Sequence, residues 1–129
     1  MVFSEFNNNG KNEYSELKRK NIDTGAGYER VLSVLQDVPT NFDTDLFLPI
    51  INEIEKFSDL HYDMNAFFTK DPNQLEINRC FKVIADHIKS SVFMIADGAL
   101  PSNKDRGYIL RRLIRRAIAV GEKLNLKSG

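Results

Sequence analysis

The chain has 129 residues, 42% of them hydrophobic, and equal numbers of acidic and basic residues, so its formal net charge is zero. This length suits one domain with a hydrophobic core, or the end of one domain joined to a second small one. No apolar run is long enough to cross a bilayer, and residues 1–9 lack the pattern of a secretory signal. We therefore expect a cytoplasmic protein without a membrane partner.

The few cysteines and histidines argue against a metal site. Cys80 is the only cysteine, which excludes an internal disulfide and disfavours cysteine-based zinc binding. His61 and His87 lie far apart and lack clustered ligands, so we expect no metal site in this chain. Asp86 and His87 fall inside a predicted helix without a nucleophile or second base, and we expect them to make local polar contacts.

The charge is unevenly distributed along the chain. Residues 104–127 carry eight basic residues against two acidic ones, a local net charge of +6 that leaves −6 on the rest. Such asymmetry predicts a basic surface for an anionic partner, for which nucleic acid is the obvious candidate.

The first predicted element is a β-hairpin within residues 2–18. Apolar side chains flank an Asn- and Gly-rich turn, as in two short paired strands: Val2, Phe3, Phe6 and Tyr14. Residues 21–27 form a polar turn punctuated by glycine, and residues 28–36 then have the apolar spacing of a helix. Pro39 should end that helix.

A second helix is predicted to begin near Asp43 or Thr44, since either side chain can cap its N-terminus. Its buried face consists of aliphatic residues: Leu46, Ile50, Ile51 and Ile54. Pro49 is tolerable only in its first turn, and the helix should stop near Phe57. Residues 58–71 are mixed and polar.

Two longer helices complete the chain. The first should cover residues 73–96, after a break at Pro72, with a core-facing stripe of six residues: Ile77, Phe81, Ile84, Ile88, Val92 and Ile95. Gly98 suits the left-handed conformation that terminates helices. The last helix should cover residues 105–124. The predicted fold class is therefore mainly α, with a short N-terminal β-hairpin followed by about four helices.

Residues 23–30, DTGAGYER, are the first candidate site. Gly25 and Gly27 allow a ligand to approach the main chain, and Glu29 and Arg30 open the following helix. A plain glycine turn and a solvated arginine explain the string equally well when it is taken alone.

The second candidate site is the last helix, and the loop before that helix is the third. Four arginines should lie opposite the apolar face of that helix, where they can hold phosphates: Arg111, Arg112, Arg115 and Arg116. Few acids are near enough to offset their mutual repulsion, which favours an anionic partner over a merely solvated face. Asn103, in the loop before the helix, offers donors and an acceptor at an exposed position, although it can equally be a turn or N-cap residue.

Four blocks of the sequence, in this order, resemble alanyl-tRNA synthetases: NIDTGAGYERVLSVLQ, NFDTDLF, VIADHIKSSVFMIADGALPSN and RGYILRRLIRRA. The opening VFSEFN also resembles the strand that enters the last part of the catalytic sheet of that family, so the hairpin should be an edge of a class II catalytic sheet. The resemblance implies two parts, which are the end of the catalytic domain in residues 1–38 and a helical acceptor-stem recognition region in residues 39–129.

Roles for individual residues follow from this resemblance. DTGAGYER corresponds to motif 3 of class II synthetases, which implies that Arg30 binds the ATP phosphates and that Asp23 faces the alanine ammonium group. Gly25 and Gly27 would shape a small amino-acid pocket. ATP, with Mg²⁺, would be a substrate of the intact enzyme. Motifs 1 and 2 and the editing domain lie outside this chain, so we expect it to be inactive alone.

The resemblance also implies a tRNA partner. Asn103 corresponds to the asparagine that recognises the G·U wobble pair in the acceptor stem of tRNA(Ala). Backbone contacts would come from five arginines: Arg106, Arg111, Arg112, Arg115 and Arg116. A stand-alone helical RNA-binding module and a purely structural helical domain remain as alternatives, but neither explains residues 23–30.

Overall fold

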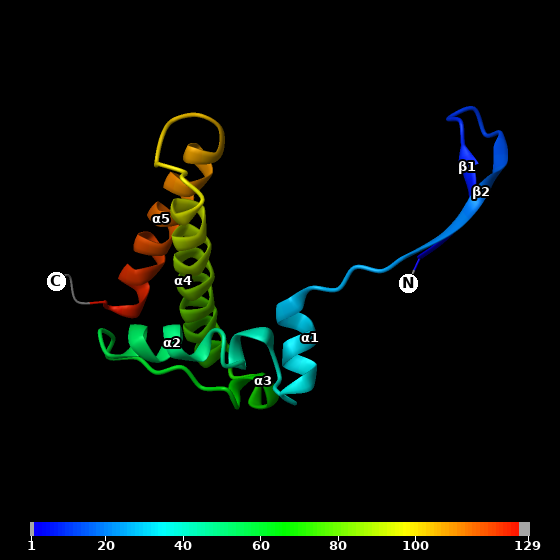
Figure 1. Ribbon diagram of the computed structural model, residues 1–129. Helices are drawn as coiled ribbons and strands as arrows, with labels where there is room; N and C mark the ends of the chain where they lie inside the picture. The colour runs from blue at the N-terminus through cyan, green and yellow to red at the C-terminus, as the bar shows by residue number, and fades with distance from the viewer. Residues whose placement is uncertain (1, 127–129) are drawn as a thin grey trace.

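The computed structural model describes residues 2–126 and consists of a two-stranded hairpin and a helical body (Figure 1). Strands β1, Val2–Asn8, and β2, Tyr14–Asp23, pair antiparallel in an irregular register between Ser4 and Phe6. The predicted hairpin is confirmed, and its second strand runs five residues further than expected.

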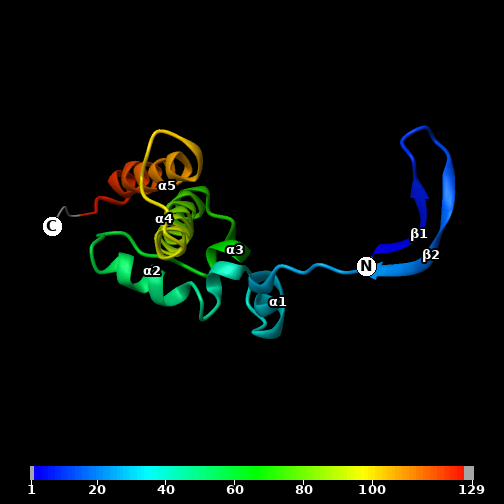
Figure 2. The same cartoon turned by 45° about the horizontal axis from the view of Figure 1, so that its top comes forward.

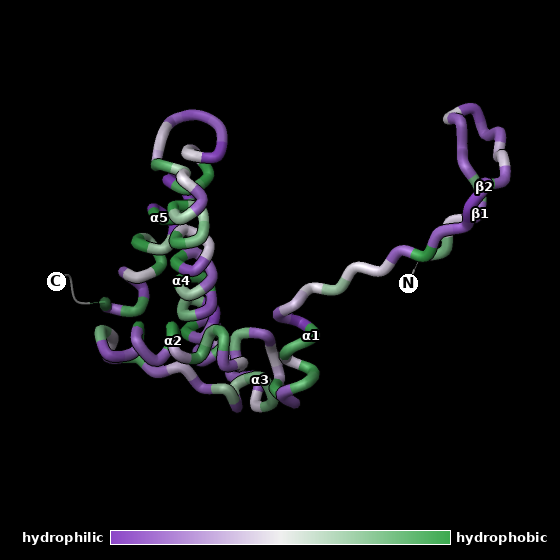
Figure 3. Tube along the Cα trace, viewed as in Figure 1, coloured by the Kyte–Doolittle hydropathy of each residue, from purple (hydrophilic) through white to green (hydrophobic). Residues whose placement is uncertain are grey.

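The hairpin lies apart from the helices, as both Figure 1 and Figure 2 show, and residues 24–27 connect the two parts. Its larger side chains are exposed, among them Phe3, Phe6 and Ile22. Figure 3 shows the tip of the hairpin as mainly hydrophilic. An isolated two-stranded hairpin is marginally stable in water, so this one needs packing that the helical body does not supply.

Helix α1, Tyr28–Leu35, follows the connecting segment and confirms the helix predicted there. It ends before Pro39, however. Asp37 adopts a left-handed backbone conformation with φ of 51°, and the Val38 amide donates to the Ser33 carbonyl at 3.1 Å. A left-handed residue of this kind terminates the helix by satisfying its last carbonyls, so Pro39 is not the cause.

The capping prediction for the next helix was wrong. A short 3₁₀ turn, Asn41–Asp43, intervenes, and helix α2, Leu48–Glu55, begins five residues after Asp43 with no side-chain cap. Thr44 instead donates its hydroxyl to the Asn41 carbonyl at 2.7 Å. Pro49 lies in the first turn of α2, as expected, because its missing amide hydrogen has no intrahelical partner there.

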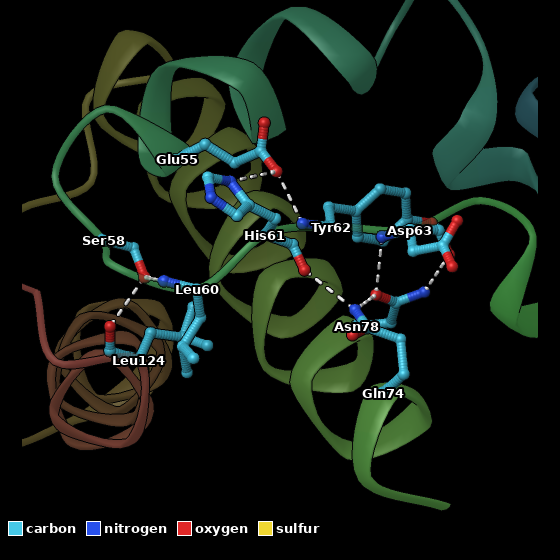
Figure 4. Close-up of polar contacts among 9 residues, drawn as sticks. All are labelled: Glu55, Ser58, Leu60, His61, Tyr62, Asp63, Gln74, Asn78 and Leu124. Atoms are coloured by element: carbon cyan, nitrogen blue, oxygen red, sulfur yellow. Dashed lines mark hydrogen bonds and ion pairs between the residues drawn. The ribbon is translucent and has the colours of Figure 1, made fainter. Parts of the chain in front are cut away.

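The polar segment after α2 is held by side-chain contacts with distant elements, which Figure 4 shows. The side-chain oxygen of Asn78 accepts a hydrogen bond from the backbone N–H of Asp63 at 3.0 Å. The side-chain nitrogen of Asn78 donates one to the backbone carbonyl of Asp63 at 2.6 Å. Ser58 donates to the Leu124 carbonyl at 2.7 Å. This segment also contains α3, Ala66–Thr69, which was not predicted and brings the described residues to five α-helices.

Helix α4, Pro72–Ala96, confirms the predicted long helix and starts one residue early. Proline suits the first helical position because its φ is already helical. Asp71 caps it by accepting from the Asn73 amide at 3.1 Å, and Gly98 follows with φ of 82°. Helix α5, Asp105–Gly121, lies beside α4 and continues into a 3₁₀ turn, Glu122–Leu124 (Figures 1 and 2).

The core lies where α2 crosses the first half of α4 (Figure 2). Its buried members come from α2 and its N-cap, from α4 and from the C-terminal turn: Phe47, Ile51, Ile54, Cys80, Phe81, Ile84, Ala85 and Leu124. The predicted core-facing stripe of α4 is therefore only half correct. Phe81 and Ile84 are buried, whereas Ile88, Val92 and Ile95 are exposed, because α2 does not extend over the second half of the helix.

Candidate functional site

Residues 23–30 form an exposed strand-to-helix connection. Asp23 ends β2, Gly27 is the N-cap of α1 with φ of −69° and ψ of 120°, and Arg30 lies in the first turn of that helix. Neither the Asp23 carboxylate nor the Arg30 guanidinium has a hydrogen-bond or ion-pair partner within residues 2–126. Both charged groups are thus available to a ligand.

The two glycines of this segment face open space in the described part of the chain. A Cβ at Gly25 would meet nothing within 4 Å, and one at Gly27 would meet only the Arg30 side chain, at an ordinary 3.7 Å. Neither has a positive φ. Within residues 2–126, therefore, nothing limits the size of a side chain or ligand beside Gly25.

An ion pair that the sequence analysis missed joins this connection to the helical body. Lys89 of α4 donates to the Glu29 carboxylate, next to Arg30. The same ammonium lies 4.4 Å from the centre of the Phe47 ring, within cation–π range. These contacts hold α1 against α4 and so set where Arg30 stands. No local sequence signal links residues 60 positions apart.

Asp43, expected to cap a helix, is instead the centre of a buried polar cluster. It is 3% exposed and accepts hydrogen bonds from the Thr40 hydroxyl at 2.6 Å and the Tyr62 hydroxyl at 2.7 Å. Burial and then the bond to Asp43 raise the pKa of Tyr62 far above its usual value. Burial lowers the pKa of the neighbouring Lys82, and the Asp43 charge partly opposes this. The cluster is structural, because its groups satisfy one another.

The structure brings Asn103 together with three arginines of α5. One pocket of about 350 Å³ is lined by five side chains: Asn103, Tyr108, Arg111, Arg112 and Arg115. All five arginines of α5 are exposed, but Arg106 and Arg116 do not line this pocket. The half-exposed Tyr108 was missed, although its spacing of three and four residues from Arg111 and Arg112 places it on their face.

Within this pocket Arg111 donates a hydrogen bond from Nη1 to Oδ1 of Asn103. The side-chain nitrogen of Asn103, Nδ2, has no hydrogen-bond partner within the described residues and can donate to a ligand. The guanidinium groups of Arg112 and Arg115 have no ion-pair partner in residues 2–126 either. The pocket thus presents hydrogen-bond donors and uncompensated positive charge.

Gly107, also missed by the sequence analysis, fixes the loop that carries Asn103. A Cβ at this position would lie 2.3 Å from the Ser102 hydroxyl and 2.4 Å from the Leu100 carbonyl oxygen. The Ser102 amide donates to the Gly107 carbonyl at 3.0 Å. Only glycine permits such close passage of the loop over the helix. A glycine within the first turn of a predicted helix, in the string RGY, was the sequence signal that could have indicated this close contact.

The described residues contain no group of three or more His, Cys, Asp or Glu side chains that could hold a metal ion. His87 lies 3.0 Å from the Asp86 carboxylate, as the prediction of local polar contacts required, and His61 lies 3.9 Å from the Glu55 carboxylate. Among the described helices, none has both the length and the apolar character of a membrane span.

Comparison with known proteins identifies the family. The model for class II (A) tRNA synthetases matches residues 1–129, and the chain belongs to this family. It is 57% identical over 128 residues to an alanine–tRNA ligase of Ureaplasma parvum and 59% identical over 126 residues to one of Mesomycoplasma hyopneumoniae. A third, from Mycoplasmopsis synoviae, is 62% identical over 117 residues.

These matches cover almost all of this chain and a small part of each relative. They include 99%, 98% and 91% of the chain, but 14%, 14% and 13% of the respective relatives. The chain therefore corresponds to about one seventh of the length of these relatives.

Proposed function

We propose that this chain is part of a cytoplasmic alanine–tRNA ligase, to which it contributes one wall of the ATP and alanine site and a surface for the tRNA(Ala) acceptor stem. The names of the relatives support the parent activity. The division into residues 1–38, from the catalytic domain, and residues 39–129, for stem recognition, is supported by the break between α1 and the following 3₁₀ turn.

In the activation step, the alanine carboxylate attacks the α-phosphorus of ATP, which forms alanyl-adenylate and releases pyrophosphate. Arg30 would neutralise the charge on the ATP phosphates, which its unpaired guanidinium can bind in a bidentate manner. Asp23 would pair with the alanine ammonium group and orient the amino acid. Gly25 and Gly27 would let the substrate approach the main chain.

In the transfer step, a hydroxyl of the terminal adenosine of tRNA takes the alanyl group and AMP leaves. The acceptor stem must then lie in a set register, which is the role we propose for the surface around Asn103. Its free amide nitrogen would donate to a base edge at the G·U pair. An approach from the minor groove is suited to A-form RNA, because base edges are accessible there and side chains cannot read the narrow major groove.

The arginines supply affinity in this proposal, and Asn103 supplies selectivity. Arg112 and Arg115 would bind phosphates beside the base pair, with Arg106 and Arg116 further along the backbone. The observation that carries the proposal is that Asn103 shares one pocket with three of the five arginines of α5.

The proposal is tested by titrating the chain with two acceptor-stem duplexes that differ only in a G·U or G·C pair at the wobble position. Binding that weakens steeply with salt and favours the G·U duplex is expected. Equal affinity for both duplexes would show that this surface does not recognise the base pair. Binding that does not depend on salt would show that it does not bind the phosphates.

A further inference from the structure

A groove runs between α4 and α5 on a face that the proposed function does not use. It has a volume of about 590 Å³, and its walls are mostly aliphatic: Ile84, Ile88, Val92 and Ile95 from α4, and Ile114 and Ile118 from α5. Val92 is 59% exposed and Ile118 is 62% exposed. Neighbouring half-exposed aliphatic side chains that line one groove are typical of a surface that another segment covers.

Two buried polar atoms show that the cover is not purely apolar. His87 and Ser91, four residues apart on α4, both line the groove and are each 7% exposed. The His87 Nδ1 atom lies 3.0 Å from the Asp86 carboxylate, but His87 Nε2 and the Ser91 hydroxyl have no partner within the described residues. Buried polar groups in native proteins are almost always hydrogen-bonded. An occupant of the groove that brings a polar group to this point would satisfy both atoms.

The dimensions suit a third helix. The groove follows α4 from Ile84 to Ile95, eleven residues or about 16 Å along a helix axis, which matches three turns of a packed helix. Such a helix would carry apolar side chains at helical spacing and one hydrogen-bonding side chain near its middle. Nucleic acid does not fit, because the groove has no Lys or Arg in its lining and Glu122 stands at one end.

We propose that an amphipathic helix from another part of the same parent polypeptide occupies this groove and hydrogen-bonds to His87 and Ser91. The relatives are about seven times longer than this chain, so such a segment is available in a parent of their length. Leu126, the last residue that the structure describes, itself lines the groove. A covalently linked segment has a high effective concentration at this site, unlike a separate partner.

This proposal rests only on the parent being longer than this chain, as its relatives are. It is independent of the RNA and ATP roles proposed above, so either can fail without the other.

Thiol labelling of two adjacent positions tests the proposal. Val92→Cys lies in the groove, and Phe93→Cys, from a residue that is 62% exposed and does not line it, is the matched control. In the full-length parent protein, labelling of Cys at position 92 should be at least about tenfold slower than at position 93, and the 129-residue chain should show no such difference. Equal labelling rates in the parent would overturn the proposal.

The source of the occupant is tested in the same measurement. Protection that persists on dilution and without RNA supports a segment of the same polypeptide. Protection that disappears on dilution assigns the groove to a second copy, and protection that requires an acceptor-stem duplex assigns it to RNA, and either result overturns the proposal. Ser91→Ala should lower the Tm of the parent but not that of the 129-residue chain, since only the parent would lose a hydrogen bond.

Discussion

Arg111 and Asn103 are joined by a hydrogen bond in which the guanidinium donates and the side-chain carbonyl accepts. This bond fixes which end of the amide is occupied, because the oxygen faces Arg111 and the nitrogen stays free. A residue of the helix thereby sets the orientation of a residue in the loop, and the polarity of the pocket depends on both.

Replacement of Asn103 should affect selectivity more than affinity. Asn103→Ala should cost about 1–3 kcal/mol on the G·U duplex and little on the G·C duplex, the scale of one specific base contact. Titration of both duplexes at one salt concentration measures the difference. Equal losses on the two duplexes would instead make Asn103 a structural residue of the loop.

Arg111 should differ from Arg115 because, of the two, only Arg111 donates a hydrogen bond to Asn103 within the described residues. Arg111→Ala should lower affinity for both duplexes and also weaken the preference for G·U. Arg115→Ala should lower both affinities alike and flatten the salt dependence. In a double-mutant cycle, Arg111→Ala and Asn103→Ala should couple by about 0.5–3 kcal/mol in the G·U preference. Additive effects would show that Arg111 acts through its charge alone.

Arg30 should be required for adenylate formation in the intact parent enzyme. Arg30→Ala removes a charge directed at the ATP phosphates and should slow alanine-dependent exchange of pyrophosphate into ATP by about 10²-fold or more, the scale of one transition-state donor. Lys18→Ala, which removes an exposed cation of β2, is the control and should leave the exchange rate unchanged. The 129-residue chain alone should show no exchange, and unchanged exchange in the Arg30 variant would make Arg30 a surface residue.

Gly107→Ala distinguishes packing from helix propensity by the sign of its effect. If helix propensity alone mattered, replacing glycine by alanine would stabilise the helix by about 1 kcal/mol. The new methyl group would instead collide with the Ser102 hydroxyl and the Leu100 carbonyl, so we expect lower stability and a weaker G·U preference. Gly121→Ala is the control in the same helix, since its methyl would meet only the end of the Leu126 side chain, at 3.0 Å. Thermal unfolding compares the two, and a stabilised Gly107 variant would contradict the close passage of the loop.

Tyr62→Phe should reduce the free energy of unfolding by about 1.5–3 kcal/mol, because it removes a hydrogen bond to a buried carboxylate. Tyr14→Phe, at an exposed position, is the control and should change it little. The pKa of Tyr62 is raised in the folded state, so its contribution is complete below about pH 10, the unfolded value, and declines as pH rises further. Denaturant unfolding of wild type and variant across that range should show their difference shrink. A constant difference would show that the hydroxyl makes no such bond.

The sequence by itself determined the elements whose signals are local. Apolar spacing predicted α1, α4 and α5, and alternation around an Asn- and Gly-rich turn predicted the hairpin. Helical periodicity also predicted that Arg111, Arg112, Arg115 and Arg116 avoid the buried side of α5, and all four are exposed. Their proximity to Asn103 is a finding of the structure.

Only the tertiary structure decided which side chains are buried and what they contact. Asp43 has the sequence context of a cap, yet it bonds Tyr62 across 19 residues, and Glu29 pairs with Lys89 across 60. Periodicity marks a stripe on α4 but cannot tell that α2 covers Phe81 and leaves Val92 exposed. These outcomes depend on contacts between segments far apart in the chain, for which neither residue carries a local signal.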